Sequence, residues 1–200
     1  MISVSVATAL GTFLVAAGSP GPATLAVAGA SMASGRCAGL ALGAGLAAGL
    51  AIWGVTMGLG FGVLVAQSPV FLAIFKVIGG GYLLYLAWMS GRSAMAQQAA
   101  PVALASGRAF RRGLILNLAN PKAALAWIAA LALGSGDGVA GWGVVAACAV
   151  LGAVIYGIYA MAFALDPVRM FYARARRGIE VVTAGLFALA GLRLLTWRGV

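Results

Sequence analysis

Two short motifs place a capping residue beside proline inside segments that are otherwise apolar: SPGP at Ser19–Pro22 and NPK at Asn120–Lys122. A proline in a helix interior removes a backbone donor and clashes with the preceding turn. In hydrocarbon such a break is tolerated only where protein or a water-filled cavity satisfies the freed backbone groups. Ser19 is expected to cap a new helix whose first residue is Pro20. Two restarts of this kind, one in each half of the chain, predict a transport site at the middle of a bilayer.

Each restart leaves backbone N–H groups at the positive end of a half-helix dipole. Two such ends that face each other make a site for an anionic group, for example an α-carboxylate. Gly21 would let a ligand approach the backbone closely, and Thr24 and Asn117 would add a hydroxyl and an amide from the adjoining turns. The alternative interpretation is that the prolines only kink the helices for packing, but the matched pair favours a site.

Lys122 is the residue in these motifs that carries a charge. It follows Arg112 by ten residues (122 − 112), so it is expected about 15 Å into the membrane. Ionisable groups at such depth usually mark substrate paths or proton relays; the alternative is a long side chain that reaches an interface. The predicted substrate-binding residues are Pro20, Gly21, Pro22, Thr24, Asn117, Asn120, Pro121 and Lys122.

The composition indicates an all-α integral membrane protein. Of the 200 residues, 64% are hydrophobic and 8% are charged, whereas a soluble domain has about 25% charged residues. Apolar runs of spanning length recur from end to end. The net charge of +10 comes mainly from arginines between those runs, where orientation signals and contacts with anionic lipid are the usual explanation. A nucleic-acid partner is therefore not expected.

Residues for other chemistries are scarce. The chain has no histidine, and its two cysteines, Cys37 and Cys148, lie far apart, so no metal site, dithiol relay or other cofactor is expected. The acids Asp137, Asp166 and Glu180 fall at the ends of predicted spans, and no buried carboxylate is expected to offer a proton relay. No set of catalytic residues is expected within one cluster at membrane depth, so the sequence does not indicate an enzyme.

Six membrane spans fit the apolar runs, and the first is too long for one straight crossing of about 20 residues and too short for two. A broken helix resolves that mismatch. A stretch with linker character divides the chain into a three-helix repeat at 1–90, a cytoplasmic linker at 91–112 and a second three-helix repeat at 113–200. Because each repeat has an odd number of spans, the two repeats are inverted, with helices one and four broken. The predicted spans are Ile2–Ser34, Ala38–Ala66, Val70–Ser90, Gly113–Gly134, Gly138–Leu165 and Gly178–Trp197.

Basic residues alternate between the loops. The loops after spans two and four carry none, whereas those after spans one, three and five are rich in arginine. By the positive-inside rule the odd loops are cytoplasmic and both termini face outward. The odd-loop arginines are Arg36, then Arg92, Arg108, Arg111 and Arg112, then Arg169, Arg174, Arg176 and Arg177.

Several motifs together resemble the lysine-exporter family (LysE/RhtB) of small bacterial inner-membrane exporters. They are the SPGP motif, GRCAGL at Gly35–Leu40, the glycines of Gly43–Gly49, KVIGGGYL at Lys76–Leu83, and GLILNLANPK at Gly113–Lys122. The resemblance covers essentially the whole chain with order and spacing intact. It implies six spans and efflux driven by the proton motive force, and all the predicted site residues except Thr24 match the signature motifs of the family.

One departure from the family pattern concerns the substrate. Many members follow the first motif with an acidic or amide residue, where this chain has Ala23, Thr24 and Leu25. A basic substrate would lack a side-chain acid there, which favours a neutral one. The wider superfamily includes thiol-electron carriers, but the absence of paired cysteines argues against that branch.

The sequence thus predicts a secondary transporter that exports small, neutral amino acids or their derivatives across the bacterial inner membrane, with protons as the candidate coupling ion. Its partners would be the substrate and membrane lipid, and the sequence leaves a homo-oligomer open. The alternative is a passive pore for small solutes, because opposed half-helix N-termini also exclude cations in channels.

Overall fold

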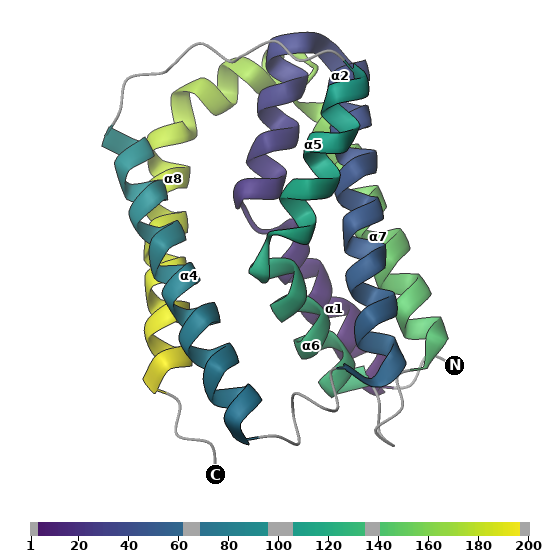
Figure 1. Ribbon diagram of the computed structural model, residues 1–200. Coiled ribbons are helices and arrows are strands. Elements are labelled where there is room, and N and C mark those ends of the chain that lie inside the picture. The colour runs from purple at the N-terminus through teal and green to yellow at the C-terminus, as the bar shows by residue number, and fades with distance from the viewer. Residues whose placement is uncertain (1–3, 62–68, 96–105, 135–140, 197–200) are drawn as a thin grey trace. The chain divides into compact units, whose positions relative to one another are not determined.

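The computed structural model describes residues 4–61, 69–95, 106–134 and 141–196, and within these ranges every regular element is a helix (Figure 1). In chain order the elements are α1 (Val4–Gly18), α2 (Pro22–Thr56), the π-helical turn η1 (Met57–Phe61), α4 (Pro69–Met95), α5 (Ser106–Leu118), α6 (Pro121–Gly134), α7 (Trp142–Ala162) and α8 (Asp166–Thr196). The predicted all-α fold is therefore confirmed for the described residues.

Helix α2 reverses direction at Gly35, whose φ of 78° and ψ of 176° are not helical. A Cβ atom on Gly39 would collide with the Ser31 hydroxyl. Along one straight helix eight residues would separate these two positions by about 12 Å, so the chain must turn back between them, as Figure 1 shows. Glycine adopts a positive φ without steric cost. We call residues 22–34 the first arm of α2 and residues 36–56 its second arm.

Both predicted helix interruptions are present. Helix α1 ends at Gly18 and α2 begins at Pro22, while α5 ends at Leu118 and α6 begins at Pro121. The axes of α5 and α6 are bent by 59° at their interruption. We call the segment 19–21 break one and the segment 119–120 break two.

The expected capping at break one is wrong in detail. The N-cap of α2 is Gly21, in extended conformation, and the first helical residue is Pro22 rather than Pro20. The reason is the second proline: Pro22 disfavours helical angles at the residue before it, so a helix begun at Pro20 could not pass Gly21. Ser19 instead closes the end of α1, because its hydroxyl donates to the carbonyl oxygen of Ala16 at 3.0 Å.

The chain forms two compact units, and each combines parts of both sequence halves. The first unit, residues 1–64 and 101–166, contains α1, α2, η1, α5, α6 and α7. The second unit, residues 65–100 and 167–200, contains α4 and nearly all of α8. Residues 96–105 of the predicted linker lie outside the described residues.

Glycines set the helix packing of the first unit, where α2 packs against α5 and α7 and α1 packs against α6 and α7. A Cβ atom on Gly45 would collide with the carbonyl oxygen of Phe110, and one on Gly49 would lie 2.8 Å from Cβ of Asn117. Small residues allow such close backbone approach between membrane helices. Because the contacts advance in the same direction along both helices, the second arm of α2 and α5 run parallel.

Helix α8 begins at Asp166, ahead of Gly178, where the predicted last membrane span begins. An acidic residue followed by proline is favourable in the first turn of a helix. In the second unit Arg176 Nε lies 2.8 Å from a carboxylate oxygen of Glu180, one turn away. Arg176 also donates to the carbonyl oxygen of Ser93 on α4 at 2.9 Å. Glu180 is buried and paired with Arg176, although its position at the end of a predicted span gave no reason to expect burial.

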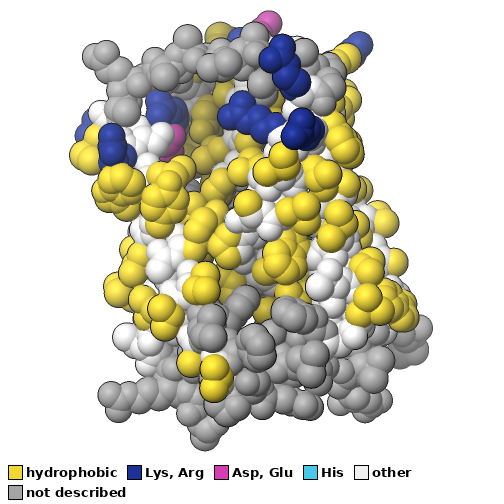
Figure 2. All heavy atoms as spheres, viewed as in Figure 1, with side chains coloured by type: hydrophobic (Ala, Val, Ile, Leu, Met, Phe, Trp, Pro, Cys, Tyr) yellow, Lys and Arg dark blue, Asp and Glu magenta, His cyan; other side chains and the backbone are white. Residues whose placement is uncertain are grey.

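The described helices have the length and hydropathy of membrane spans. Residues 22–60, 142–162 and 166–196 each qualify, and the bent pair α5 and α6 would make a fourth span. The 22–60 segment contains the reversal at Gly35, so it is two arms rather than one straight span. Large hydrophobic side chains lie exposed along these helices (Figure 2), as expected where lipid covers the surface.

We predict that Gly45→Ala destabilises the protein by about 1–3 kcal/mol, because the added methyl group has no room beside Phe110. Gly157→Ala is the matched control: no described atom lies within 4 Å of a Cβ atom there, and alanine is the better helix former. Thermal unfolding in detergent, followed by helical circular dichroism, measures both. Equal midpoints for the two variants would contradict the packing described above.

Candidate functional site

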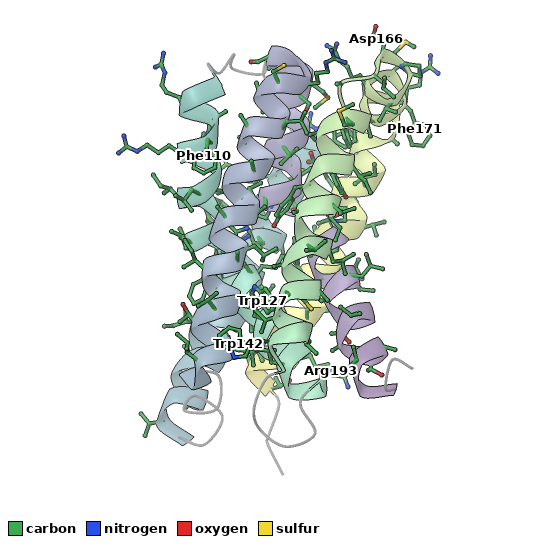
Figure 3. The ribbon with its side chains drawn as sticks, turned by 90° about the vertical axis from the view of Figure 1, so that its right-hand side faces the viewer. Phe110, Trp127, Trp142, Asp166, Phe171 and Arg193 are labelled. Atoms are coloured by element: carbon green, nitrogen blue, oxygen red, sulfur yellow. The ribbon has the colours of Figure 1, made fainter. Side chains whose placement is uncertain are left out.

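The two breaks meet through Lys122. Its Nζ atom donates a hydrogen bond to the carbonyl oxygen of Ser19 at 2.9 Å, across 103 positions of the chain. The helices on either side of the breaks also pack together, since Phe13 of α1 and Trp127 of α6 have ring centroids 4.9 Å apart. Trp127 is fully buried and lies between the helices (Figure 3). The structure therefore brings the SPGP and NPK motifs together within the first unit.

The carbonyl groups that end α1 receive donors from the second half of the chain. The Tyr159 hydroxyl on α7 donates to the carbonyl oxygen of Gly18 at 2.9 Å, and Lys122 donates to that of Ser19. These carbonyls lie past the last intrahelical bonds, at the negative end of the half-helix dipole. The Lys122 ammonium thus sits at a helix C-terminus as well as at the start of α6.

Both restarted helices have capped N-termini. At the start of α2 the Thr24 hydroxyl accepts from the Gly21 N–H at 2.9 Å and donates to the Gly21 carbonyl at 3.1 Å. At the start of α6 the side-chain oxygen of Asn120 accepts from the Lys122 backbone N–H at 3.1 Å. The predicted capping role of Asn120 is confirmed, and Thr24 acts on its own helix start.

A cavity of about 20 Å³ lies between the two breaks, which is room for about one water molecule. Four predicted site residues line it: Gly21, Thr24, Asn120 and Lys122. The other four, Pro20, Pro22, Asn117 and Pro121, lie outside its lining. The remaining lining residues are mostly apolar: Ala16, Ala17, Ala23, Leu50, Ala123, Ala126 and Tyr156.

Asn117 is outside the cavity lining and is fully buried. Its amide nitrogen donates to the Tyr156 hydroxyl at 3.1 Å, and its backbone carbonyl accepts from the Trp53 indole at 3.3 Å. Among the described residues its side-chain oxygen has no hydrogen-bond partner. Burying an acceptor without a hydrogen-bond partner costs free energy of folding.

Tyr156 and Tyr159 are not among the predicted site residues. They lie three residues apart and therefore on one face of α7, and both point polar tips at the break region. A signal was present in the sequence, because a tyrosine inside an apolar span usually needs a hydrogen-bond partner for its hydroxyl. Periodicity alone did not identify that partner.

The donors gathered here suit an anion. One ammonium and two helix N-termini, together with a phenol, surround or adjoin a cavity with apolar walls. Each of these groups stabilises a carboxylate or another oxygen acceptor. The cavity as it stands is smaller than an amino acid, so a ligand of that size requires the two breaks to separate.

Comparison with known proteins gives a consistent result. A family model described as LysE type translocator matches residues 14–198. The chain is 32% identical to the threonine efflux protein of Escherichia coli over 92% of this chain and 94% of that protein. It is 31% identical to the uncharacterized membrane protein YahN of Escherichia coli over 96% of this chain and 88% of that protein.

A shorter match, 35% identical over 38% of each chain, is to the homoserine/homoserine lactone efflux protein of Salmonella typhi. No solved structure matches the chain.

We predict that Tyr159→Phe destabilises the protein by about 1–3 kcal/mol, because the Gly18 carbonyl then loses its donor inside the helix packing. Tyr85→Phe makes the same chemical change on a half-exposed side chain of α4 and should leave stability unchanged. Thermal unfolding in detergent separates the two. Equal loss from both variants would mean that the contact with Gly18 contributes nothing.

Proposed function

This chain belongs to the LysE type translocator family, and we propose that it is a secondary transporter that exports small, neutral amino acids or their derivatives across the bacterial inner membrane. The family membership and the full-length similarity to a threonine efflux protein support efflux of an amino acid. The partial similarity to a homoserine efflux protein points in the same direction. The absence of an acidic side chain next to the SPGP motif supports a neutral substrate.

The observation that carries this proposal is the contact of Lys122 with break one. An ammonium bound to a backbone carbonyl beside a small polar cavity is suited to exchange that carbonyl for a substrate carboxylate, which is the stronger acceptor. The N–H groups at the start of α6 would add to the attraction. Pro20, Pro22 and Pro121 shape the two breaks, and the residues that line the cavity contact the substrate.

The same contact couples binding to movement. While Lys122 donates to the Ser19 carbonyl, it links the helices at break one, α1 and α2, to the helices at break two, α5 and α6. A substrate carboxylate that takes the ammonium would release this link and let the two breaks separate. Alternating access then consists of opening the cavity first to one side of the membrane and then to the other, as in transporters built around discontinuous helices.

We propose six membrane crossings in two inverted repeats, and four of these crossings fall in the first unit: α1 with the first arm of α2, the second arm of α2, α5 with α6, and α7. Helix α1 leads to break one and α5 leads to break two from opposite ends of that unit (Figure 1). The parallel packing of α5 with the second arm of α2 brings Arg36 and Arg111 to one end. We assign this end to the cytoplasm and both termini to the outside, by the positive-inside rule. The proton motive force is the proposed driving force.

We predict that Lys122→Ala lowers the rate of amino-acid export by about 10- to 100-fold, because a charge-assisted hydrogen bond to the substrate is lost. Export of threonine from preloaded cells or proteoliposomes gives the rate. Lys76→Ala is the matched control, because Lys76 is the only other lysine in the chain and belongs to the second unit. Normal export by a well-folded Lys122→Ala protein would mean that this residue does not bind substrate.

Counterflow distinguishes the carrier from a passive pore. External unlabelled substrate should accelerate the exit of labelled substrate from loaded proteoliposomes, because a carrier returns faster when occupied. The rate should also saturate with substrate concentration. A rate that rises linearly and shows no trans-stimulation would support the pore instead.

A further inference from the structure

The hydroxyl of Tyr156 has hydrogen-bonding capacity to spare. Tyr156 lines the cavity, and its oxygen accepts from the amide nitrogen of Asn117 at 3.1 Å. A phenol can also donate one hydrogen bond. Among the described residues no acceptor takes that proton, so it remains available to a group inside the cavity.

The other polar side chains of the cavity are already engaged. The Thr24 hydroxyl both accepts from and donates to Gly21, and Asn120 caps the start of α6. The Lys122 ammonium bonds the Ser19 carbonyl, and in the proposed function it is the group that turns to the carboxylate. Among the polar side chains of the cavity, Tyr156 is therefore the one left to bind a substrate oxygen outside the carboxylate.

Asn117 holds the Tyr156 hydroxyl in place. It is fully buried, and its backbone carbonyl is fixed by the Trp53 indole. The absence of a side chain at Gly49 lets Asn117 lie against α2, because a Cβ atom at that position would come within 2.8 Å of Asn117 Cβ. By donating to the phenol oxygen, the amide leaves the phenol proton as the group that the pair can offer.

We infer that Tyr156 is a specificity-determining residue that donates a hydrogen bond to an oxygen on the substrate side chain, with Asn117 as its positioning residue. The inference rests on the proposed function and adds the substrate class to it. A hydroxyl or carbonyl oxygen beyond the α-carbon would be recognised, while Leu50 and the alanines of the cavity contact carbon atoms. A site built around such a hydrogen bond discriminates against the isosteric hydrocarbon, because the buried polar group is then left unpaired.

The test compares threonine with valine, which has the same shape but a methyl group in place of the hydroxyl. Initial export rates of both are measured over a range of concentrations for the wild type and Tyr156→Phe in proteoliposomes. We expect Tyr156→Phe to reduce the preference for threonine by about tenfold, which is the effect of one hydrogen bond. The change should lie in the KM values: threonine should bind more weakly than to the wild type, and valine should bind no more weakly, because it no longer leaves a buried phenol unpaired.

Two further variants separate recognition from structure. Tyr159→Phe makes the same chemical change one turn away, outside the cavity lining, and should alter export of threonine and valine by the same factor. Asn117→Leu keeps the approximate volume but removes the donor that holds the phenol, and should reduce the threonine preference while Tyr156 is intact. Circular dichroism confirms that each variant is folded, and Tyr156→Phe alone decides the matter if Asn117→Leu does not fold.

Several outcomes would overturn the inference. If Tyr156→Phe slows threonine and valine equally, or changes neither, the phenol does not recognise the substrate side chain. A threonine preference that survives Tyr156→Phe would also be expected if the Asn117 amide were rotated. Its oxygen would then accept the phenol proton, and the phenol could not donate to the substrate. If the wild type exports neither amino acid faster than empty vesicles, the proposed function itself fails, and this inference fails with it.

Discussion

The structure depends on one constraint: a helix that breaks inside hydrocarbon must find partners for the backbone groups it frees. At break one the freed carbonyls of Gly18 and Ser19 receive Tyr159 and Lys122, which come from the other half of the chain. Neither half could satisfy these groups alone. The contacts that make the breaks tolerable are therefore the contacts that assemble the cavity, and the fold and the site have the same physical origin.

Close packing makes these contacts possible. Glycines on the second arm of α2 let α5 approach at backbone distance, and this holds break two beside the helices that carry break one. In the proposed mechanism the ammonium of Lys122 serves two acceptors in turn, the Ser19 carbonyl and a substrate carboxylate. Because one group would serve both, this mechanism links binding to opening.

The local features of this site could be predicted from the sequence, and the non-local ones could not. The positions of both breaks and the cap at Asn120 follow from proline and its neighbours. The restart at Pro22 was missed because two prolines compete and the second one controls the residue before it. Tyr156 and Tyr159 contact partners more than 35 positions away, and periodicity along the chain does not identify such partners. The pairing of Glu180 depends on where α8 begins, which periodicity does not indicate either.

Binding of the substrate carboxylate by Lys122 is the central claim, and nuclear magnetic resonance of the lysine side chains tests it most directly. The chain has two lysines, Lys76 and Lys122, so protein labelled with ¹⁵N-lysine gives two Nζ signals, which Lys122→Arg assigns. Titration with threonine in detergent micelles or nanodiscs should shift the Lys122 signal in a saturable way and leave Lys76 unchanged. A Lys122 signal that stays in place while threonine binds would contradict the account.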